Sequence, residues 1–214
     1  EVILVDDGST DSTCSTISRL PFLNCRLVSL DRNYGKGRAV KIGMLESRGT
    51  YRIFTDADLP YDMQSLDDCL TYLKVYHYPL VVGNRRLMNS SIQTDIPPIR
   101  MIGSRLFQWI VSRIILNLRV DTQCGLKGFS GDFADRLFPL LTVDRFAFDV
   151  EIYLLARNAR IDIKSVPVRL INNRLSTISM GKDALRMLWD IMLITARSTI
   201  GAYEIGNLMR AESE

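Results

Sequence analysis

The stretch EVILVDDGSTD, residues 1–11, decides the fold class, because a short apolar run passes directly into an acidic turn. Val2 to Val5 is rich in β-branched residues, which is typical of a buried parallel strand. In the polar turn that follows, Ser9 or Asp11 is suited to cap a helix. The pattern predicts a strand, a carboxylate-bearing turn and then a helix.

The same alternation continues over the first 85 residues. Strands are predicted at 26–30, 52–55 and 80–82, and helices at 39–47 and 64–75. The loop NYGKGR, residues 33–38, precedes the first of these helices. Strands that alternate with helices predict an α/β fold with an open, mostly parallel sheet and flanking helices.

The second half has a different pattern. Residues 99–118 are a predicted helix, and the charged residues between Asp95 and Asp121 are all arginine. Such a helix either lies on an anionic membrane surface or packs in the core with one solvated face. Residues 121–129 are predicted to be a polar loop.

Three further elements and a last helix are predicted beyond this loop: helices at 132–141 and 148–157, a strand at 165–170, and a helix at about 183–200. The last helix has apolar side chains on nearly all of its faces. The sheet, a partner subunit or lipid is therefore expected to cover much of it.

Composition excludes several classes of protein. The chain has 214 residues, 47% of them hydrophobic and 24% charged, which fits one globular domain over 1–214. The formal net charge of +3 is too small to predict a nucleic-acid partner. A single histidine argues against a zinc site or a Ser-His-Asp triad, and four cysteines without a C-x-x-C spacing indicate reduced thiols. No apolar run is long enough to span a membrane.

Charged residues follow the predicted strands. Asp56 and Asp58 come after the strand at 52–55, where α/β folds place their ligands. Two such carboxylates can hold Mg²⁺ or Mn²⁺, with water and substrate phosphate oxygens as the other ligands. Asp6 and Asp7 can accept hydrogen bonds from a ribose or a base, and Lys36 in the glycine loop can bind an anion. For each carboxylate pair, a solvated or helix-capping turn is the alternative.

The order of these motifs resembles that of the family 2 glycosyltransferases of GT-A fold, over residues 1 to about 197. The resemblance is stronger to the branch that acts on polyprenyl phosphates, the dolichyl-phosphate glucosyltransferases and mannosyltransferases. The strings DTQCGLK, residues 121–127, and FAFDVE, residues 146–151, are closer to the glucosyl type.

The resemblance implies roles for particular residues. Those expected to bind the donor are Asp6, Asp7, Lys36, Asp56 and Gln123. Those expected to act in catalysis are Asp58, Arg85, Lys127 and Asp149, with Glu151 also close to the donor sugar. Asp58 and Asp56 would bind Mg²⁺ or Mn²⁺, and Arg100 and Ser104 would hold the acceptor phosphate.

The implied activity is the inverting transfer of a hexose from a nucleotide sugar to polyprenyl or dolichyl phosphate. Glucose and UDP-glucose are favoured over mannose and GDP-mannose by family likeness alone. The helices at 99–118 and 183–200 would rest on the cytoplasmic face of a membrane, as in a peripheral protein. A family 2 enzyme with a saccharide acceptor, and a non-catalytic nucleotide-binding remnant, are the alternatives.

The chain departs from the family pattern at three points. The family begins with a central strand that would lie upstream of Glu1, so we expect an N-terminally truncated domain of low stability. Pro60 stands where some relatives carry a glutamine metal ligand. Ser176-Thr177 replaces the Ser-Lys pair of many members, which is expected to weaken acceptor binding.

Overall fold

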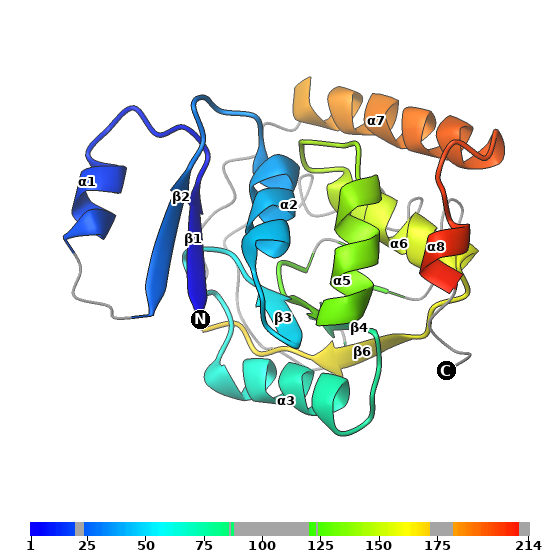
Figure 1. The fold of residues 1–214 in the computed structure, drawn as a ribbon, viewed down its shortest axis with the longest axis horizontal. Coiled ribbons are helices and arrows are strands. Elements are labelled where there is room, and N and C mark those ends of the chain that lie inside the picture. The colour runs from blue at the N-terminus through cyan, green and yellow to red at the C-terminus, as the bar shows by residue number, and fades with distance from the viewer. Residues whose placement is uncertain (20–23, 86, 88–119, 123, 172–181, 210–214) are drawn as a thin grey trace, which may run out of the picture.

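The computed structural model describes residues 1–19, 24–85, 87, 120–122, 124–171 and 182–209. In this part of the chain the strands form two sheets (Figure 1). The smaller sheet pairs β1 (Val2–Asp6) in parallel with β2 (Cys25–Ser29). The larger sheet has, in spatial order, β3 (Tyr51–Phe54), β5 (Lys127–Ser130), β4 (Leu80–Asn84) and β6 (Ile163–Pro167).

Three strands of the larger sheet run in the same direction. β5 is antiparallel to both β3 and β4, and β6 is parallel to β4. The expected open, mostly parallel α/β sheet is therefore confirmed, with one reversed strand inserted between β3 and β4. The carboxyl ends of β3 and β4 and the start of β5 consequently lie at one edge of the sheet.

Helices cover both faces of the larger sheet (Figure 1). Leu80 and Val82 belong to the main core cluster, with side chains from α2 (Lys36–Glu46), α5 (Gly131–Leu137), α6 (Phe148–Asn158) and α7 (Lys182–Thr199). Val81, between them, packs instead with Cys69 and Leu73 of α3 (Met63–Lys74). Side chains of successive strand residues point to opposite faces, so α3 lies opposite the other helices.

The remaining helices are short: α1 (Thr13–Ser18), the 3₁₀ helix η2 (Phe138–Leu140) and α8 (Gly206–Met209). The N-cap of α1 is Ser12, whose side chain makes no capping hydrogen bond, rather than Ser9 or Asp11 as predicted. The Asp11 carboxylate, one residue earlier, accepts a hydrogen bond from Thr13 N at 2.9 Å. Ser9 has another role, because it donates to the carboxylate of Asp6.

The predicted elements correspond closely to the observed ones. The predicted helices at 64–75, 148–157 and 183–200 match α3, α6 and α7 within one residue at each end, and 132–141 is divided into α5 and η2. α2 begins three residues earlier than predicted, at Lys36, and β6 two residues earlier, at Ile163. The predicted helix at 99–118 lies outside the described residues.

The polar loop predicted at 121–129 is wrong for its last residues. Lys127 to Ser130 form β5, although the sequence KGFS contains a charged residue and a glycine and shows no strand pattern. Gly128 allows α3 to approach, because a Cβ there would lie 2.6 Å from the Sγ atom of Cys69. A strand that depends on such a tertiary contact has no local signal to reveal it.

β1 is a parallel strand, as predicted, but the expectation that it is buried is wrong. Val2 is 55% exposed, and Ile3 to Val5 are half-buried. Among the described residues, β1 pairs with β2 alone, and α2 approaches it at Gly43, where a Cβ would lie 3.0 Å from Val5 Cγ2. The smaller sheet is thus held by fewer buried contacts than the larger one.

We predict that backbone amides in β1 and β2 exchange with deuterium faster than those in β4 and β5. Two-stranded sheets with exposed side chains open at low free energy, whereas β4 is buried at every position. Hydrogen exchange followed by mass spectrometry of peptides from both sheets measures the difference. Equal protection of the two sheets would contradict the prediction.

Candidate active site

The Asp-x-Asp motif lies on a strained turn directly after β3. Leu59 N donates a hydrogen bond to Asp56 O at 3.0 Å, which closes the turn around Ala57 and Asp58. Leu59 has φ of 43°, a conformation unusual for a branched side chain, and it is 56% exposed. Strain of this kind concentrates at functional sites, where the surrounding structure maintains it. The turn leaves Asp58 exposed at the carboxyl edge of the sheet.

Asp56 is held from two sides. Its carboxylate forms an ion pair with the ammonium of Lys36, the first residue of α2. On the other side it packs against the backbone of Gly125, where a Cβ would collide with the carboxylate oxygen and lie 2.8 Å from Asp56 Cγ. The structure therefore brings together the glycine loop, the Asp-x-Asp turn and the segment that leads into β5.

A buried ion pair lies behind this turn. Lys127 of β5 is fully buried, and its Nζ is 2.8 Å from Asp149 Oδ1 of α6 and 2.7 Å from Cys124 O. Burial raises the pKa of the Asp149 carboxyl, and the neighbouring Lys127 ammonium opposes that rise. Lys127, which we expected to line the sugar and phosphate pocket, makes these described contacts with the protein itself.

These two pairs form one cluster of alternating charge. Lys36 also acts electrostatically on the pKa of Asp149, lowering it, and Asp56 raises it. The four side chains come from α2, the turn after β3, β5 and α6. Four of the residues singled out from the sequence are thus neighbours in space, while their predicted contacts with a donor stay predictions.

A third ion pair lies at the end of β4. The guanidinium of Arg85 binds the carboxylate of Asp121 in a bidentate manner, with Nε–Oδ2 and Nη2–Oδ1 distances of 2.7 and 2.9 Å. Burial opposes ionisation of Asp121, yet its contacts with Arg85 prevail, and the pKa of Asp121 is lowered. Arg85 was predicted to face phosphates, and 38% of its side chain remains exposed.

Sequence reasoning missed two residues in this part of the site. Asp121 was quoted within a motif but given no role; its position as the first acid after four arginines was the available signal. The hydroxyl of Tyr61 accepts a hydrogen bond from Gly125 N at 2.8 Å and so fixes the backbone against which Asp56 packs. Nothing in the sequence around Tyr61 indicates that contact.

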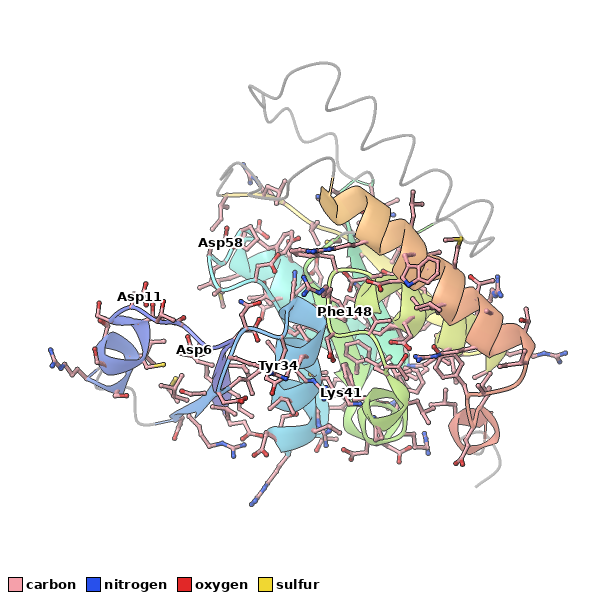
Figure 2. All side chains as sticks on the ribbon, turned by 90° about the horizontal axis from the view of Figure 1, so that it is seen from above. Asp6, Asp11, Tyr34, Lys41, Asp58 and Phe148 are labelled. Atoms are coloured by element: carbon pink, nitrogen blue, oxygen red, sulfur yellow. The ribbon has the colours of Figure 1, made fainter. Side chains whose placement is uncertain are left out.

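Asp6 is the last residue of β1, and Asp7, which follows it, connects the strand to the glycine loop. The carboxylate of Asp7 accepts hydrogen bonds from Tyr34 N at 2.9 Å and Gly35 N at 2.7 Å. Hydrogen bonds from Ser9 lower the pKa of Asp6. In Figure 2, Asp6, Tyr34, Asp58 and Phe148 lie between α1 and α7. The described contacts of both aspartates are structural, and their predicted nucleoside contacts stay predictions.

The other predicted site residues divide into two groups. Gln123, Arg100 and Ser104 lie outside the described residues. Glu151 is described and fully buried, and it binds the backbone at Thr142 and Val143 rather than the turn after β3. The expectation that it lies close to a donor sugar is therefore not supported by its contacts.

The Asp-x-Asp turn offers carboxylate oxygens, the kind of ligand that Mg²⁺ or Mn²⁺ prefers. Within the described ranges, no group of three or more His, Cys, Asp or Glu side chains is placed to hold a metal. Asp56 and exposed Asp58 supply two carboxylates on one turn, and these hard cations commonly take their remaining ligands from water and phosphate. The residues therefore fit a cation that binds together with a diphosphate.

Comparison with known proteins defines the class. Residues 1–138 match Glycosyl transferase family 2, and the chain belongs to this family.

Two relatives give a more particular likeness. A dolichyl-phosphate beta-glucosyltransferase of Dictyostelium discoideum is 36% identical over 96% of this chain and 65% of its own length. The enzyme of the same name from Drosophila melanogaster is 34% identical over 99% of this chain and 68% of its own length. The chain thus spans about two thirds of the length of the curated relatives it matches.

The fold is also that of a solved glycosyltransferase. Mycobacterium tuberculosis glucosyl-3-phosphoglycerate synthase, in complex with Mn²⁺ and UDP-glucose, superimposes with a TM-score of 0.59. The alignment covers 93% of this chain and 67% of the synthase at 19% identity, so it supports the GT-A fold alone. Across the described helices, none combines the length and hydropathy needed to cross a bilayer.

We predict that Gly125→Ala displaces the Asp56 carboxylate and disrupts its ion pair with Lys36. The added Cβ meets that carboxylate, and overpacking of this kind costs about 1–3 kcal/mol of folding free energy. Urea unfolding of the variant measures the loss. Gly206→Ala is the matched control, since a Cβ there meets nothing within 4 Å. Equal stability of the two variants would contradict the assignment.

Proposed function

We propose that this chain transfers glucose from UDP-glucose to dolichyl or polyprenyl phosphate, in a reaction that requires a divalent metal. Membership of family 2 and the likeness to dolichyl-phosphate beta-glucosyltransferases support the reaction class. The observation that carries the proposal is the convergence of Lys36, Asp56, Lys127 and Asp149 beside the exposed Asp58 turn.

The arrangement suits a reaction between two anions. A lipid phosphate is already an anionic nucleophile at neutral pH, so the site needs no histidine to remove a proton. When bound, Mg²⁺ or Mn²⁺ neutralises charge on the donor diphosphate. Asp58 and Asp56 would hold it, and Lys36 and Arg85, which pair with Asp56 and Asp121 in this structure, would meet phosphate oxygens at the same edge.

The transfer itself is a single displacement. An oxygen of the lipid phosphate bonds to the anomeric carbon of glucose as the bond from that carbon to the UDP oxygen breaks. Attack from the face opposite UDP inverts the anomeric carbon and gives a β-linked lipid-phospho-sugar. The buried Lys127–Asp149 pair keeps β5 and α6 in register behind the reacting atoms, so that the exposed groups have a rigid support.

We also propose that the chain is a peripheral protein at the cytoplasmic face of a membrane, and the exposed face of α7 supports its contact with a membrane surface. Ile191 and Ile194 of this helix pack in the core. Trp189 and Met192, on another face, are 59% and 57% exposed. The described part of the protein thus covers only one face of this helix, although we expected much of the helix to be covered. An exposed apolar face with a tryptophan suits the interface of a lipid bilayer.

We predict that Asp58→Asn lowers transfer of labelled glucose from UDP-glucose to dolichyl phosphate by at least about 100-fold, because metal charge stabilisation is worth several kcal/mol. Label entering the organic phase, with Mn²⁺ present, measures transfer. Asp67→Asn is the matched control, an exposed carboxylate on α3. Full activity of Asp58→Asn would refute the metal assignment.

The same assay separates the competing functions. Label that enters a saccharide but not dolichyl phosphate favours the family 2 enzyme with a saccharide acceptor. Binding of UDP without transfer to any acceptor favours the non-catalytic remnant. Label from GDP-mannose in place of UDP-glucose would correct the donor and leave the reaction class intact.

We predict that Trp189→Ser combined with Met192→Ser weakens binding to vesicles of phosphatidylcholine and phosphatidylserine by at least about tenfold, because each buried side chain contributes about 1.5–3 kcal/mol. Co-sedimentation measures the bound fraction. Met63→Ser is the control, since Met63 is 71% exposed on α3, which lies across the molecule from α7 (Figure 1). Unchanged binding of the double variant would refute the membrane surface.

A further inference from the structure

Glu151 is a buried carboxylate that the proposed reaction does not use. Its side chain is fully buried, and it accepts hydrogen bonds from Thr142 N, from Thr142 Oγ1 at 2.6 Å and from Val143 N at 3.0 Å. A further bond comes from the hydroxyl of Tyr203 at 2.7 Å. These donors are backbone amides and hydroxyls, so the carboxylate fixes the start of the segment that leads to α6.

That segment, residues 142–145, is the support on which α2 begins. Arg38 N donates to Asp144 O at 2.9 Å, and the Arg38 guanidinium lies 3.0 Å from the Asp144 carboxylate. The fit is close: a Cβ at Gly37 would lie 2.5 Å from Val143 O and 2.8 Å from Arg145 O. The position of the first turn of α2 therefore follows the position of this segment.

The first turn of α2 carries Lys36, the partner of Asp56. A chain of contacts thus runs from Glu151 through residues 142–145 to Gly37 and Lys36, and ends at the Asp-x-Asp turn. Backbone atoms make the contacts along this chain, except at its two ends and at the Arg38–Asp144 ion pair. Backbone contacts of this kind transmit a displacement with little loss, because packed segments are not easily compressed.

The geometry of α6 explains how one helix supports both sides of the site. Asp149 and Glu151 are two residues apart, which separates their directions by about 200° around the helix. Asp149 reaches Lys127 on the sheet, and Glu151 reaches Thr142 on the other side. Through these two carboxylates, α6 is connected both to β5 and to residues 142–145, which support the start of α2.

We propose that Glu151 is a positioning residue that sets Lys36 against Asp56 through residues 142–145, and thereby sets the affinity for the donor. The inference rests on the proposed function, in which the donor is UDP-glucose and Lys36 meets its diphosphate. It assigns to Glu151 no contact with the substrate.

The two carboxylate oxygens of Glu151 have different hydrogen-bond partners, so glutamine can serve as a conservative substitution at this position. Oε2 accepts from the amides of Thr142 and Val143, whereas Oε1 accepts from both hydroxyls and, at 3.0 Å, from the Thr142 amide as well. Hydroxyl groups can accept as well as donate, so a glutamine with its NH₂ toward them keeps its oxygen on both amides at the Oε2 position and loses only the second contact of Thr142 N. Glu151→Gln should retain the support of residues 142–145, and Glu151→Met should lose it.

The test compares UDP-glucose affinity and turnover in the full chain with Mn²⁺ present. Glu151→Met is expected to raise the KM for UDP-glucose about tenfold while kcat changes by no more than about twofold, as expected for a displaced binding group. Glu151→Gln is expected to resemble the unmodified chain. In a Lys36→Met background, Glu151→Met should raise KM no further, because both changes then remove the same contact.

A purely structural role predicts a different result. Loss of folded protein lowers the apparent kcat and leaves KM unchanged, and that outcome, or additive effects in the double variant, would overturn the proposal. Tyr203→Phe is the matched control, since it removes a hydroxyl bond to the same carboxylate and leaves the bonds from the amides of Thr142 and Val143 in place. Its KM for UDP-glucose should not change.

Two further experiments apply if the first variant does not fold or if the unmodified chain shows no transfer. If Glu151→Met does not fold, Asp144→Asn weakens the same route at the half-exposed Arg38–Asp144 pair. It should raise KM by about two- to fivefold, the range for a pair of modest strength, and an unchanged KM would overturn the proposal. If the unmodified chain transfers no sugar, the proposed function fails, and calorimetric titration of the same variants with UDP then decides the role of Glu151 alone.

Discussion

The structure depends most on the ion pair between Lys127 and Asp149. Burying two charges costs several kcal/mol per ion, and their attraction offsets that cost only when the geometry is good and the remaining hydrogen bonds are made. The ammonium of Lys127 meets the second condition by donating to Cys124 O, whereas Asp149 Oδ1, 2.8 Å from that ammonium, accepts no hydrogen bond of good angle from the described residues. The pair joins β5 to α6, and β5 is the strand that links β3 to β4. Loss of either charge would leave the other buried without its partner at the centre of the sheet.

Close backbone packing imposes a second constraint on the same edge. Gly125 admits the Asp56 carboxylate, and Gly128 admits α3 against β5. Gly37 admits the carbonyls of residues 143 and 145 against α2. In each case the glycine is needed because a Cβ would meet another segment, not because the backbone has an unusual conformation. The walls of the candidate site are therefore formed where the backbone of a glycine lies directly against a neighbouring segment, which gives the charged side chains a rigid support.

Much of the fold could be predicted from local patterns, because most strands and helices have a clear period and end in recognisable turns. The sites of Lys36, Asp56 and Asp58 could also be predicted, since they follow or precede such elements. β5 could not, because its strand state depends on Gly128 meeting α3 and on Lys127 meeting Asp149. The half-exposure of β1 had no local signal either, since an apolar run does not reveal how many neighbours a strand will have. Contacts far apart in the sequence decide all of these features.

The charge cluster consists of a fixed pair and an exchangeable pair. Lys127 and Asp149 are buried, so separating them would leave two unpaired charges in the protein interior, which solvates charges poorly. Lys36 and Asp56 keep 30% and 36% of their side-chain surface exposed, and pairs so exposed contribute only about 0–1 kcal/mol. In the proposed reaction a diphosphate and its cation would therefore replace the contact between Lys36 and Asp56 at little cost, with the ammonium moving to the phosphate and the carboxylate to the metal. The position of α2 decides whether Lys36 can make that exchange, which is why the buried carboxylate of Glu151 matters at a distance.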